Sequence, residues 1–314
     1  MQLHIPVALD RCIALLAPAI EKNSSPVVID ATLGMGGHTR ALLETFPSLR
    51  VIAFDRDTEA IAIATDALKD FSDRVTIVHA VYDEISVTLE NLGIDSVDGI
   101  LFDLGVSSLQ LDDADRGFAY SQEAPLDMRM DQSSGISAYD VLMTYTRSDL
   151  IHIIRLYGEE KFAPKIVDNI IKAREAGQLK STKDLAEIVK ESIPAPARRT
   201  GGNPAKRTFQ ALRIEVNQEL DVLTRAIPQA LSALRVGGRI VVMAYQSLED
   251  KIVKKAFTEV TASGTPLGLP VDLPNSAAHY SFVIRGSESA SEQEILENPR
   301  ASSMRLRAVE RVAA

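Results

Sequence analysis

The chain has 314 residues, of which 46% are hydrophobic and 25% charged, values typical of a globular protein with one large core or two domains. Its formal net charge of −9 at pH 7 argues against non-specific coating of nucleic acid, because such binding depends on neutralising phosphates. No apolar run approaches the roughly 18 residues of a membrane span, and the N-terminus lacks the basic-then-apolar form of a signal peptide.

The cysteine and histidine content restricts the chemistry further. The single cysteine, Cys12, excludes an internal disulfide and is compatible with a reducing cytosol. The five histidines are scattered without the spacing of metal ligands, so no metal site is predicted. We therefore expect a cytoplasmic protein with no membrane partner and no metal.

Helical and strand patterns alternate along the first third of the chain. The predicted helices are 7–20, 39–46 and 58–68, and the predicted strands are 27–30, 51–55, 75–79 and 97–103. This alternation implies right-handed βαβ units and a parallel sheet, which is an α/β fold. The carboxyl ends of parallel strands meet at one edge of the sheet, where ligand groups collect.

The stretch 27–38 carries the strongest local signal. Three β-branched residues lead into Asp30, and Gly34, Gly36 and Gly37 follow before a helical pattern begins. Glycines let the backbone turn sharply and approach a ligand closely. A buried strand, a glycine turn and a helix N-terminus in this order are typical of sites for nucleotide-like ligands.

The identity of that ligand follows from what surrounds the glycines. Thr39 stands where a dinucleotide fingerprint has its third glycine, and Asp30 would repel a pyrophosphate. A ligand with a cationic end and no phosphate fits better, and S-adenosylmethionine is such a ligand. Asp55 ends the second strand and is placed to accept hydrogen bonds from ribose hydroxyls. We predict S-adenosylmethionine as the cofactor; a nicotinamide-dependent dehydrogenase is the weakest alternative.

Acidic residues end three of these four strands. They are Asp30, Asp55 and Asp103, and Tyr82 lies just past the end of the remaining strand. Methylation of a pyrimidine C5 needs a cysteine nucleophile, but Cys12 precedes the glycine turn. Methylation of an exocyclic amine needs only acceptors that hold its N–H groups beside the methyl donor, and Asp103 could supply one.

The pattern changes after Asp103. Residues 112–136 are rich in aspartate and have no clear period, and only helices follow, at 139–145, 149–157, 161–176 and 182–193. Ser181-Thr-Lys-Asp offers an N-terminal cap for the last of these helices. A strand returns at 238–245. We therefore predict a sheet domain built from 1–111 and 207–314, with an inserted helical domain at 112–206.

The C-terminal part contains the last strand candidates. The segments 279–285 and 304–309 could pair antiparallel at the edge of the sheet, whereas 263–275 is predicted as loop and 286–300 as mobile. Two basic clusters leave a choice between a nucleic-acid groove and a solvated helix face. They are Arg198, Arg199, Lys206, Arg207 and Arg213, and then Lys251, Lys254 and Lys255.

The motifs resemble a known family over nearly the whole chain. They are His4–Val7, Asp30–His38, Asp103–Asp113, Arg116–Phe118, Pro125–Asp131, Tyr157–Ala163, Arg207–Ile214, Ser247–Asp250 and Asn298–Ala301. In this order they are similar to the bacterial 16S rRNA cytosine-N4 methyltransferases, the RsmH/MraW family. The resemblance implies a class I, Rossmann-like, S-adenosylmethionine-dependent methyltransferase sheet with an inserted all-helical domain. It also implies N4 methylation of one cytidine in the decoding region of the small ribosomal subunit.

The family's site residues can be placed on this chain one by one. The resemblance implies cofactor contacts at Gly36, Gly37, His38, Asp55, Tyr82, Asp103 and Gln110. It does not by itself make Asp103 catalytic, and binding the cofactor is the plainer role of this residue; we nevertheless take Asp103 as the catalytic candidate. Asp127 and Asp131, in a loop that could face the acceptor, are further candidates, although solvated loop acids are the simpler interpretation.

The chain departs from the family pattern at several positions. Tyr245-Gln246 stands where relatives often have Phe-His, and Met35 stands where an arginine is common. We expect activity despite Gln246, because the amine proton can leave after methyl transfer. The Asp-Pro-Pro-Tyr element of many DNA amino-methyltransferases is replaced by Asp103-Leu-Gly-Val.

The expected partner is 16S rRNA, within the small ribosomal subunit, gripped by the helical insert and the basic groups at 198–213. We expect a monomer or homodimer. Two alternatives stay open: a methyltransferase of the same fold that acts on DNA or a protein amine, and a non-catalytic cofactor-binding protein of ribosome assembly.

Overall fold

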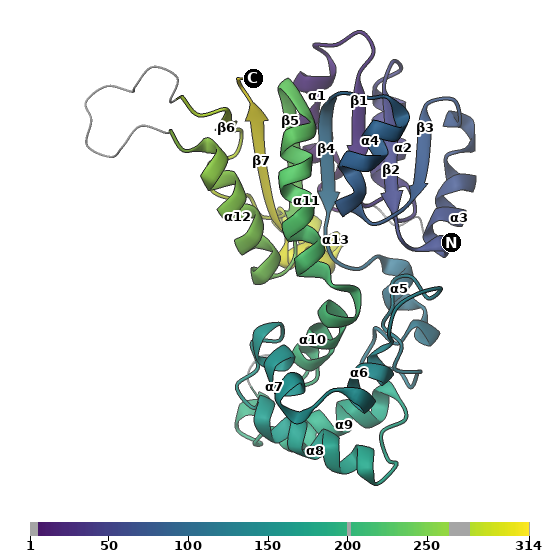
Figure 1. The fold of residues 1–314 in the computed structure, drawn as a ribbon, viewed down its shortest axis with the longest axis vertical. Helices are drawn as coiled ribbons and strands as arrows, with labels where there is room; N and C mark the ends of the chain where they lie inside the picture. Colours follow the sequence, from purple (N-terminus) through teal and green to yellow (C-terminus); the bar gives the residue numbers. More distant parts are fainter. Residues whose placement is uncertain (1–5, 200–201, 264–276, 314) are drawn as a thin grey trace. The chain divides into compact units, whose positions relative to one another are not determined.

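The chain forms two compact units in the computed structural model, which describes residues 6–199, 202–263 and 277–313. The first unit combines 1–105 with 220–314, and the second is 106–219 (Figure 1). His4 of the first predicted motif, and nearly all of the predicted loop 263–275, lie outside the described residues.

A seven-stranded sheet forms the centre of the first unit (Figure 1). Its strands are β1 (Val27–Asp30), β2 (Arg50–Asp55), β3 (Val75–His79), β4 (Val97–Asp103), β5 (Leu234–Ala244), β6 (Tyr280–Phe282) and β7 (Arg305–Arg311). They lie in the order β3-β2-β1-β4-β5-β7-β6, with β1 to β5 parallel and β7 antiparallel to both of its neighbours. This confirms the predicted Rossmann-like sheet and the antiparallel pair at its edge.

Helices cover both faces of the sheet. One face carries α1 (Leu9–Ile20), α2 (Gly37–Thr45) and α3 (Thr58–Ala67); the other carries α4 (Ile85–Leu92), α11 (Glu219–Ala233) and α12 (Ser247–Thr261). Successive strand residues point to opposite faces, so Val28 packs in one core and Ile29 in the other. Because both faces are buried, the central strands are mostly apolar.

Strand order places the predicted site. The chain leaves β1 toward β2 and later returns to β4 on the other side of β1. At such a switch point the loops that follow the two strands separate and leave room for a ligand beyond their carboxyl ends. Asp30 and Asp103 end the two strands on either side of this point.

Two segments differ from the sequence expectation. Helix α4 was not predicted; it is a short element that ends at Gly93, whose φ is +65°. Residues 286–300 were expected to be mobile, but residues 292–297 form α13 (Glu292–Glu297). Glu294 of this helix accepts a hydrogen bond from the N–H of Ala8, which ties the segment to the start of α1.

The second unit is helical, as predicted, with its own apolar core. Its helices are α5 (Ser108–Asp112), α6 (Ala138–Thr144), α7 (Arg147–Leu156), α8 (Ala163–Glu175), α9 (Thr182–Ser192) and α10 (Lys206–Asn217). The predicted cap of α9 is present: Ser181 accepts from the N–H of Asp184, and Asp184 accepts from the N–H of Ser181.

The structure moves both boundaries of the insert. The sequence placed them at 111/112 and 206/207, which put α10 in the sheet domain, but the second unit begins at residue 106 and ends at 219. Helix α10 belongs to the insert because Phe209, Ala211 and Leu212 pack in its core. The sequence of an amphipathic helix shows that one face is buried, but not against which core.

Among the described residues, none of the helices combines the length and apolar character that a membrane crossing requires.

Candidate active site

The glycine turn joins β1 to α2, as predicted. Gly34 and Gly36 have φ values of +52° and +84°, left-handed conformations that other residues rarely adopt. Gly37 is needed for a different reason, because a Cβ there would lie 2.4 Å from Cγ of Pro6. The turn therefore depends on glycine for backbone conformation at two positions and for a close approach at the third.

Asp30 stabilises the turn from inside the protein. Its side chain is buried and accepts hydrogen bonds from the N–H of Thr32 at 3.1 Å and the hydroxyl of Thr39 at 2.7 Å. Burial raises the pKa of the Asp30 carboxyl, although hydrogen bonds and His38 oppose the shift. Thr39, which the sequence singled out as a missing glycine, is thus a partner of Asp30.

Asp55 connects the end of β2 to the same turn. Its two oxygens accept from the N–H groups of Gly34 at 2.7 Å and Asp57 at 2.9 Å. Burial raises the pKa of this carboxyl against the effect of those N–H groups. A carboxylate has about four acceptor sites, so two remain in number for the predicted ribose hydroxyls.

A backbone hydrogen bond brings the segment before Tyr82 to the end of β2. The N–H of Ala80 donates to the carbonyl of Asp55 at 3.1 Å, and Tyr82 follows two residues later. Its ring meets the ring of Phe102 edge-on, with centroids 5.5 Å apart and planes at 84°. The half-buried ring is thereby fixed, and its contact with the cofactor stays a prediction.

Asp103 is held from two neighbouring segments. Its backbone N–H donates to Oγ1 of Thr32 at 2.7 Å, which joins the end of β4 to the loop after β1. Its side-chain Oδ1 accepts a 2.7 Å hydrogen bond from the hydroxyl of Tyr245, directly after β5. The predicted catalytic carboxylate therefore lies at the carboxyl edge of the sheet with a defined partner.

His38 lies on the other side of the same carboxylate. Its Nδ1 is 3.8 Å from Oδ2 of Asp103, and its Nε2 is 3.1 Å from the carbonyl oxygen of Val7. A carbonyl oxygen only accepts, so Nε2 must carry a hydrogen. These contacts hold the buried ring between the N-terminal segment and Asp103. The predicted contact of His38 with the cofactor stays a prediction.

Gln110 belongs to the second unit, unlike the other predicted cofactor residues. Its side-chain oxygen accepts from the N–H of Ser107, and its own N–H donates to the Ser107 hydroxyl, so the pair caps α5. The structure thus gives Gln110 a local role, and contact with the cofactor stays a prediction.

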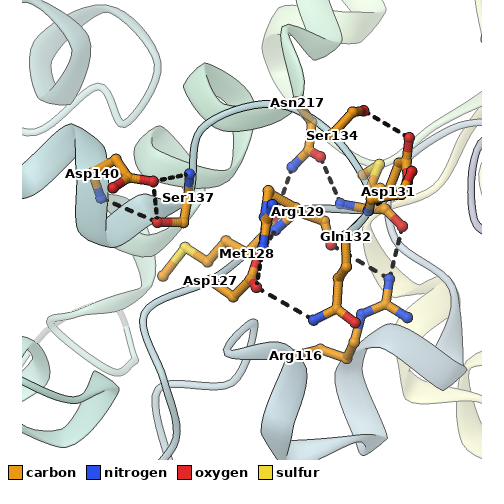
Figure 2. Close-up of polar contacts among 12 residues, drawn as sticks. Arg116, Asp127, Met128, Arg129, Asp131, Gln132, Ser134, Ser137, Asp140 and Asn217 are labelled. Carbon is orange, nitrogen blue, oxygen red and sulfur yellow. Dashed lines mark hydrogen bonds and ion pairs between the residues drawn. The ribbon is translucent and has the colours of Figure 1, made fainter.

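A tightly held loop follows α5 in the second unit (Figure 2). Met128 in this loop is buried and has a φ of +60°, which is unusual for a residue with a side chain. Asn217 of α10 donates to the carbonyl of Met128 and accepts from the N–H of Met130, both at 2.8 Å. Buried Arg116 donates to the Met130 carbonyl at 2.8 Å. These bonds hold the backbone in its strained conformation.

The two candidate acids of this loop have partners within it. Asp127 pairs with Arg129 through bonds of 2.8 and 2.9 Å (Figure 2). Burial alone would raise the pKa of Asp127, but hydrogen bonds from Arg129 hold it below its usual value. Asp131 accepts from the hydroxyls of Ser133 and Ser134. Both acids thus help to shape the loop.

The Ser247–Asp250 motif begins helix α12, directly after Gln246. Gln246 is the N-cap of α12, and Glu249 accepts from the N–H groups of both Tyr245 and Gln246. Asp250 forms a bidentate pair with Arg307 of β7. This motif therefore anchors the helix that follows β5.

The basic groups at 198–213 are less open than the sequence suggested. Arg213 pairs with Glu219 through two hydrogen bonds of 2.8 and 2.9 Å, in a largely buried position. Arg198 donates to the carbonyl of Ile193. Lys206 and Arg207 are exposed. Arg213 thus forms a structural ion pair with Glu219 and is not part of an open cationic groove.

Sequence reasoning missed Tyr245 as a member of the site. It was noted only as a departure from the family pattern. The strand-end rule that found Asp30, Asp55 and Asp103 would have found it, because the fifth predicted strand ended on this residue. Among the described residues, the structure contains no group of three or more His, Cys, Asp or Glu side chains arranged to hold a metal ion.

Comparison with known proteins identifies the class. The model of the MraW methylase family matches residues 1–312, and the chain belongs to this family. "Ribosomal RNA small subunit methyltransferase H" of Renibacterium salmoninarum is 56% identical over 313 residues, 98% of this chain and 95% of that protein. The protein of the same name from Mycolicibacterium smegmatis is also 56% identical, over 98% of this chain and 84% of its own length. The protein of this name from Streptomyces avermitilis is 54% identical, over 98% of this chain and 97% of its own length.

The residues present fit the predicted cofactor. Gly34 and Gly36 give the turn after β1 its left-handed backbone, and Asp55 has carboxylate acceptor positions beyond the two described bonds, as the predicted ribose contact requires. No basic side chain for a pyrophosphate bonds to this turn among the described contacts; its charged partners are acids, Asp30 and Asp55. Membership in a methylase family confirms S-adenosylmethionine as the cofactor.

Proposed function

We propose that this protein transfers a methyl group from S-adenosylmethionine to the N4 amino group of a cytidine in the decoding region of 16S rRNA. The observation that carries the proposal is the Asp103 carboxylate, fixed by Tyr245 at the same sheet edge as the glycine turn, in a member of a methylase family. The name of the relatives, small subunit methyltransferase, supports the small ribosomal subunit as substrate, and the cytoplasm as the place of action.

The proposed chemistry asks little of the protein beyond positioning. Bound S-adenosylmethionine supplies an electrophilic methyl group. The amino group of cytosine is a weak nucleophile because its lone pair is delocalised into the ring. Asp103 would accept a hydrogen bond from one N–H, which orients the amine and favours a localised lone pair. The proton leaves after transfer, so a strong base is not required.

Cys12 argues against methylation at carbon C5 of a pyrimidine. That reaction needs a thiolate that adds to the ring. Cys12 is 1% exposed, lies 3.7 Å from the sulfur of Met243, and has its pKa raised by burial. It is the only cysteine in the chain, so an amine acceptor is favoured.

One basic stretch of the insert, residues 161–213, supports an RNA-binding role. Residues 161–213 contain twelve lysines and arginines against five aspartates and glutamates, in a chain with a net charge of −9. The exposed lysines of this stretch are Lys161, Lys165, Lys172, Lys180, Lys183, Lys190 and Lys206. Lys165 and Lys172 are seven residues apart on α8, about two helical turns, and therefore share one face. Lysines on one helix face are suited to a phosphate backbone.

The reaction can be tested with small subunits from cells that lack the gene. The subunits are incubated with purified protein and methyl-labelled S-adenosylmethionine, and the labelled nucleoside is identified after digestion of the RNA. We expect label in N4-methylated cytidine, with a rate at least about 100-fold lower in Asp103→Ala. The control Asp66→Ala, which removes an exposed carboxylate of α3, should keep the wild-type rate.

Other outcomes separate the alternatives. Label in another nucleoside would contradict the N4 assignment, and preferential labelling of DNA or a protein amine would favour a different acceptor. Cofactor binding by the wild type without any transfer would favour the non-catalytic interpretation. For the insert, Lys165→Glu with Lys172→Glu should weaken binding to the subunit about tenfold and leave cofactor affinity unchanged, whereas Lys69→Glu in the sheet unit should not.

A further inference from the structure

Tyr245 lies where the fifth strand reaches the site. The register of the parallel pair sets Asp103 of β4 opposite Met243 of β5, and Tyr245 follows two residues later. Its ring packs against the apolar core on one face of the sheet. Its backbone N–H donates to Glu249 at 3.0 Å. Backbone and ring are both fixed, so the hydroxyl is held at one place.

The direction of the hydrogen bond to Asp103 is also fixed. Burial, together with the charge of Asp103, raises the pKa of the Tyr245 phenol. The phenol therefore keeps its proton, and it donates to Oδ1 of Asp103 at 2.7 Å. A short bond from a neutral hydroxyl to a carboxylate is among the stronger hydrogen bonds in proteins.

Two further contacts of Asp103 help to define its geometry. The backbone N–H of Asp103 donates to the Thr32 hydroxyl oxygen, and His38 Nδ1 lies 3.8 Å from the second carboxylate oxygen of Asp103, Oδ2. Thr32 fixes the backbone, but a side-chain carboxylate can still rotate about its own axis. The Tyr245 hydroxyl holds Oδ1 at hydrogen-bonding distance, and Oδ2 then lies on the side of His38.

We propose that Tyr245 is a positioning residue for Asp103: its hydroxyl sets the rotation of the carboxylate that receives the acceptor amine. This inference rests on the proposed function of Asp103. Reaction rates depend steeply on orientation, and supported side chains hold productive geometry to about 10–20°. Losing the hydroxyl while keeping the ring should therefore slow transfer without removing the site.

The chain offers a matched control for a purely structural role. Tyr280 of β6 is also largely buried in the first unit, and its hydroxyl donates to the carbonyl of Leu231 at 2.6 Å. Tyr280→Phe also removes a phenol hydroxyl from a comparable environment. The hydrogen bond lost is to a backbone carbonyl of α11, and not to Asp103. A structural contribution to stability should be similar in the two variants.

The test is a double-mutant cycle on full-length protein. Single-turnover methyl transfer to unmethylated small subunits is measured for wild type, Tyr245→Phe, Asp103→Asn, the double variant and Tyr280→Phe, with melting temperatures alongside. We expect Tyr245→Phe to be slower on the order of tenfold, at a melting temperature close to that of Tyr280→Phe, which keeps the wild-type rate. In the Asp103→Asn background, Tyr245→Phe should have no further effect, because Tyr245 acts through Asp103.

Two results would overturn the inference. One is a Tyr245→Phe rate within about twofold of wild type, and the other is an equal effect of Tyr245→Phe with and without the Asp103 carboxylate. If the wild type does not produce N4-methylated cytidine, the proposed function fails instead. The same cycle is then measured on the dissociation constant of S-adenosylmethionine, which needs no acceptor. Coupling between Tyr245 and Asp103 in cofactor binding would support the positioning role, and its absence would refute it.

Discussion

The glycine turn at 30–38 and the loop at 113–137 are both irregular segments with left-handed backbone, but they are stabilised differently. In the turn, Gly34 and Gly36 adopt positive φ with no steric penalty. In the loop, Met128 adopts a φ of +60° at a cost of about 1–2 kcal/mol. Asn217 and Arg116 bind the backbone around it and offset that cost. A turn made by glycine is set locally, whereas a turn made by methionine depends on distant partners.

The largest expected effect comes from Gly117, the position in the second loop that does require glycine. Its φ is +73°, and a Cβ would lie 2.2 Å from the backbone oxygen of Pro125, which cannot move aside as a flexible side chain would. We expect Gly117→Ala to lower the free energy of unfolding of this unit by about 3 kcal/mol or more, measured by urea denaturation and hydrogen exchange. Gly177→Ala is the control, because its φ is +66° but no atom lies within 4 Å. It should cost about 1 kcal/mol. Equal costs would show that close approach at Gly117 does not matter.

A smaller effect should follow from removing the distant partner in the second loop. Asn217→Ala leaves the buried N–H of Met130 and the carbonyl of Met128 without the bonds described above. We expect a loss of about 2–3 kcal/mol in the free energy of unfolding, with faster hydrogen exchange in 113–137. Because the glycine turn is set by its own residues, the affinity for the cofactor should not change in this variant.

The control for Asn217 is another amide in the same unit. Asn169 donates to the Ser192 hydroxyl at 2.9 Å in a half-buried position, so Asn169→Ala should cost about 1 kcal/mol or less. An Asn217→Ala variant as stable as this control would mean that Met128 holds its conformation without Asn217.

The smallest expected effects are opposite responses to pH. The Asp127 pKa is lowered in the folded protein, so its stabilising effect is present above the unfolded value of about 3.9 and is lost as pH falls further. The pKa of Asp55 is raised, so the folded state binds this proton more tightly, and stability rises as pH falls from neutral toward about 4.

Melting temperatures between pH 3 and 7 test this contrast. The advantage of wild type over Asp127→Asn should shrink as the pH falls below about 4, whereas its advantage over Asp55→Asn should grow as the pH falls from 7 to 4. The exposed Asp66→Asn variant serves as reference for a surface carboxylate. If the difference in melting temperature between wild type and variant changes with pH in the same direction for Asp127 and Asp55, the two pKa values are not shifted in opposite directions.

The sequence by itself determined the elements whose signals are local. The glycines at 34, 36 and 37 and the acids that end β1, β2 and β4 predicted the turn, the ligand edge of the sheet and the cofactor. Ser181 predicted the start of α9. These features depend on residues within a few positions of one another, since conformational freedom, strand ends and caps are local properties.

Only the tertiary structure decided which distant groups meet. It assigned α10 to the insert, paired Arg213 with Glu219, and set the hydroxyl of Tyr245 on Asp103, 142 positions earlier in the chain. It also showed that Asp30 bonds to Thr39 inside the turn, while Asn217 holds Met128 from 89 positions away. Such contacts arise from packing between elements, which sequence periodicity does not specify, because the same amphipathic face or strand end can be buried against many partners.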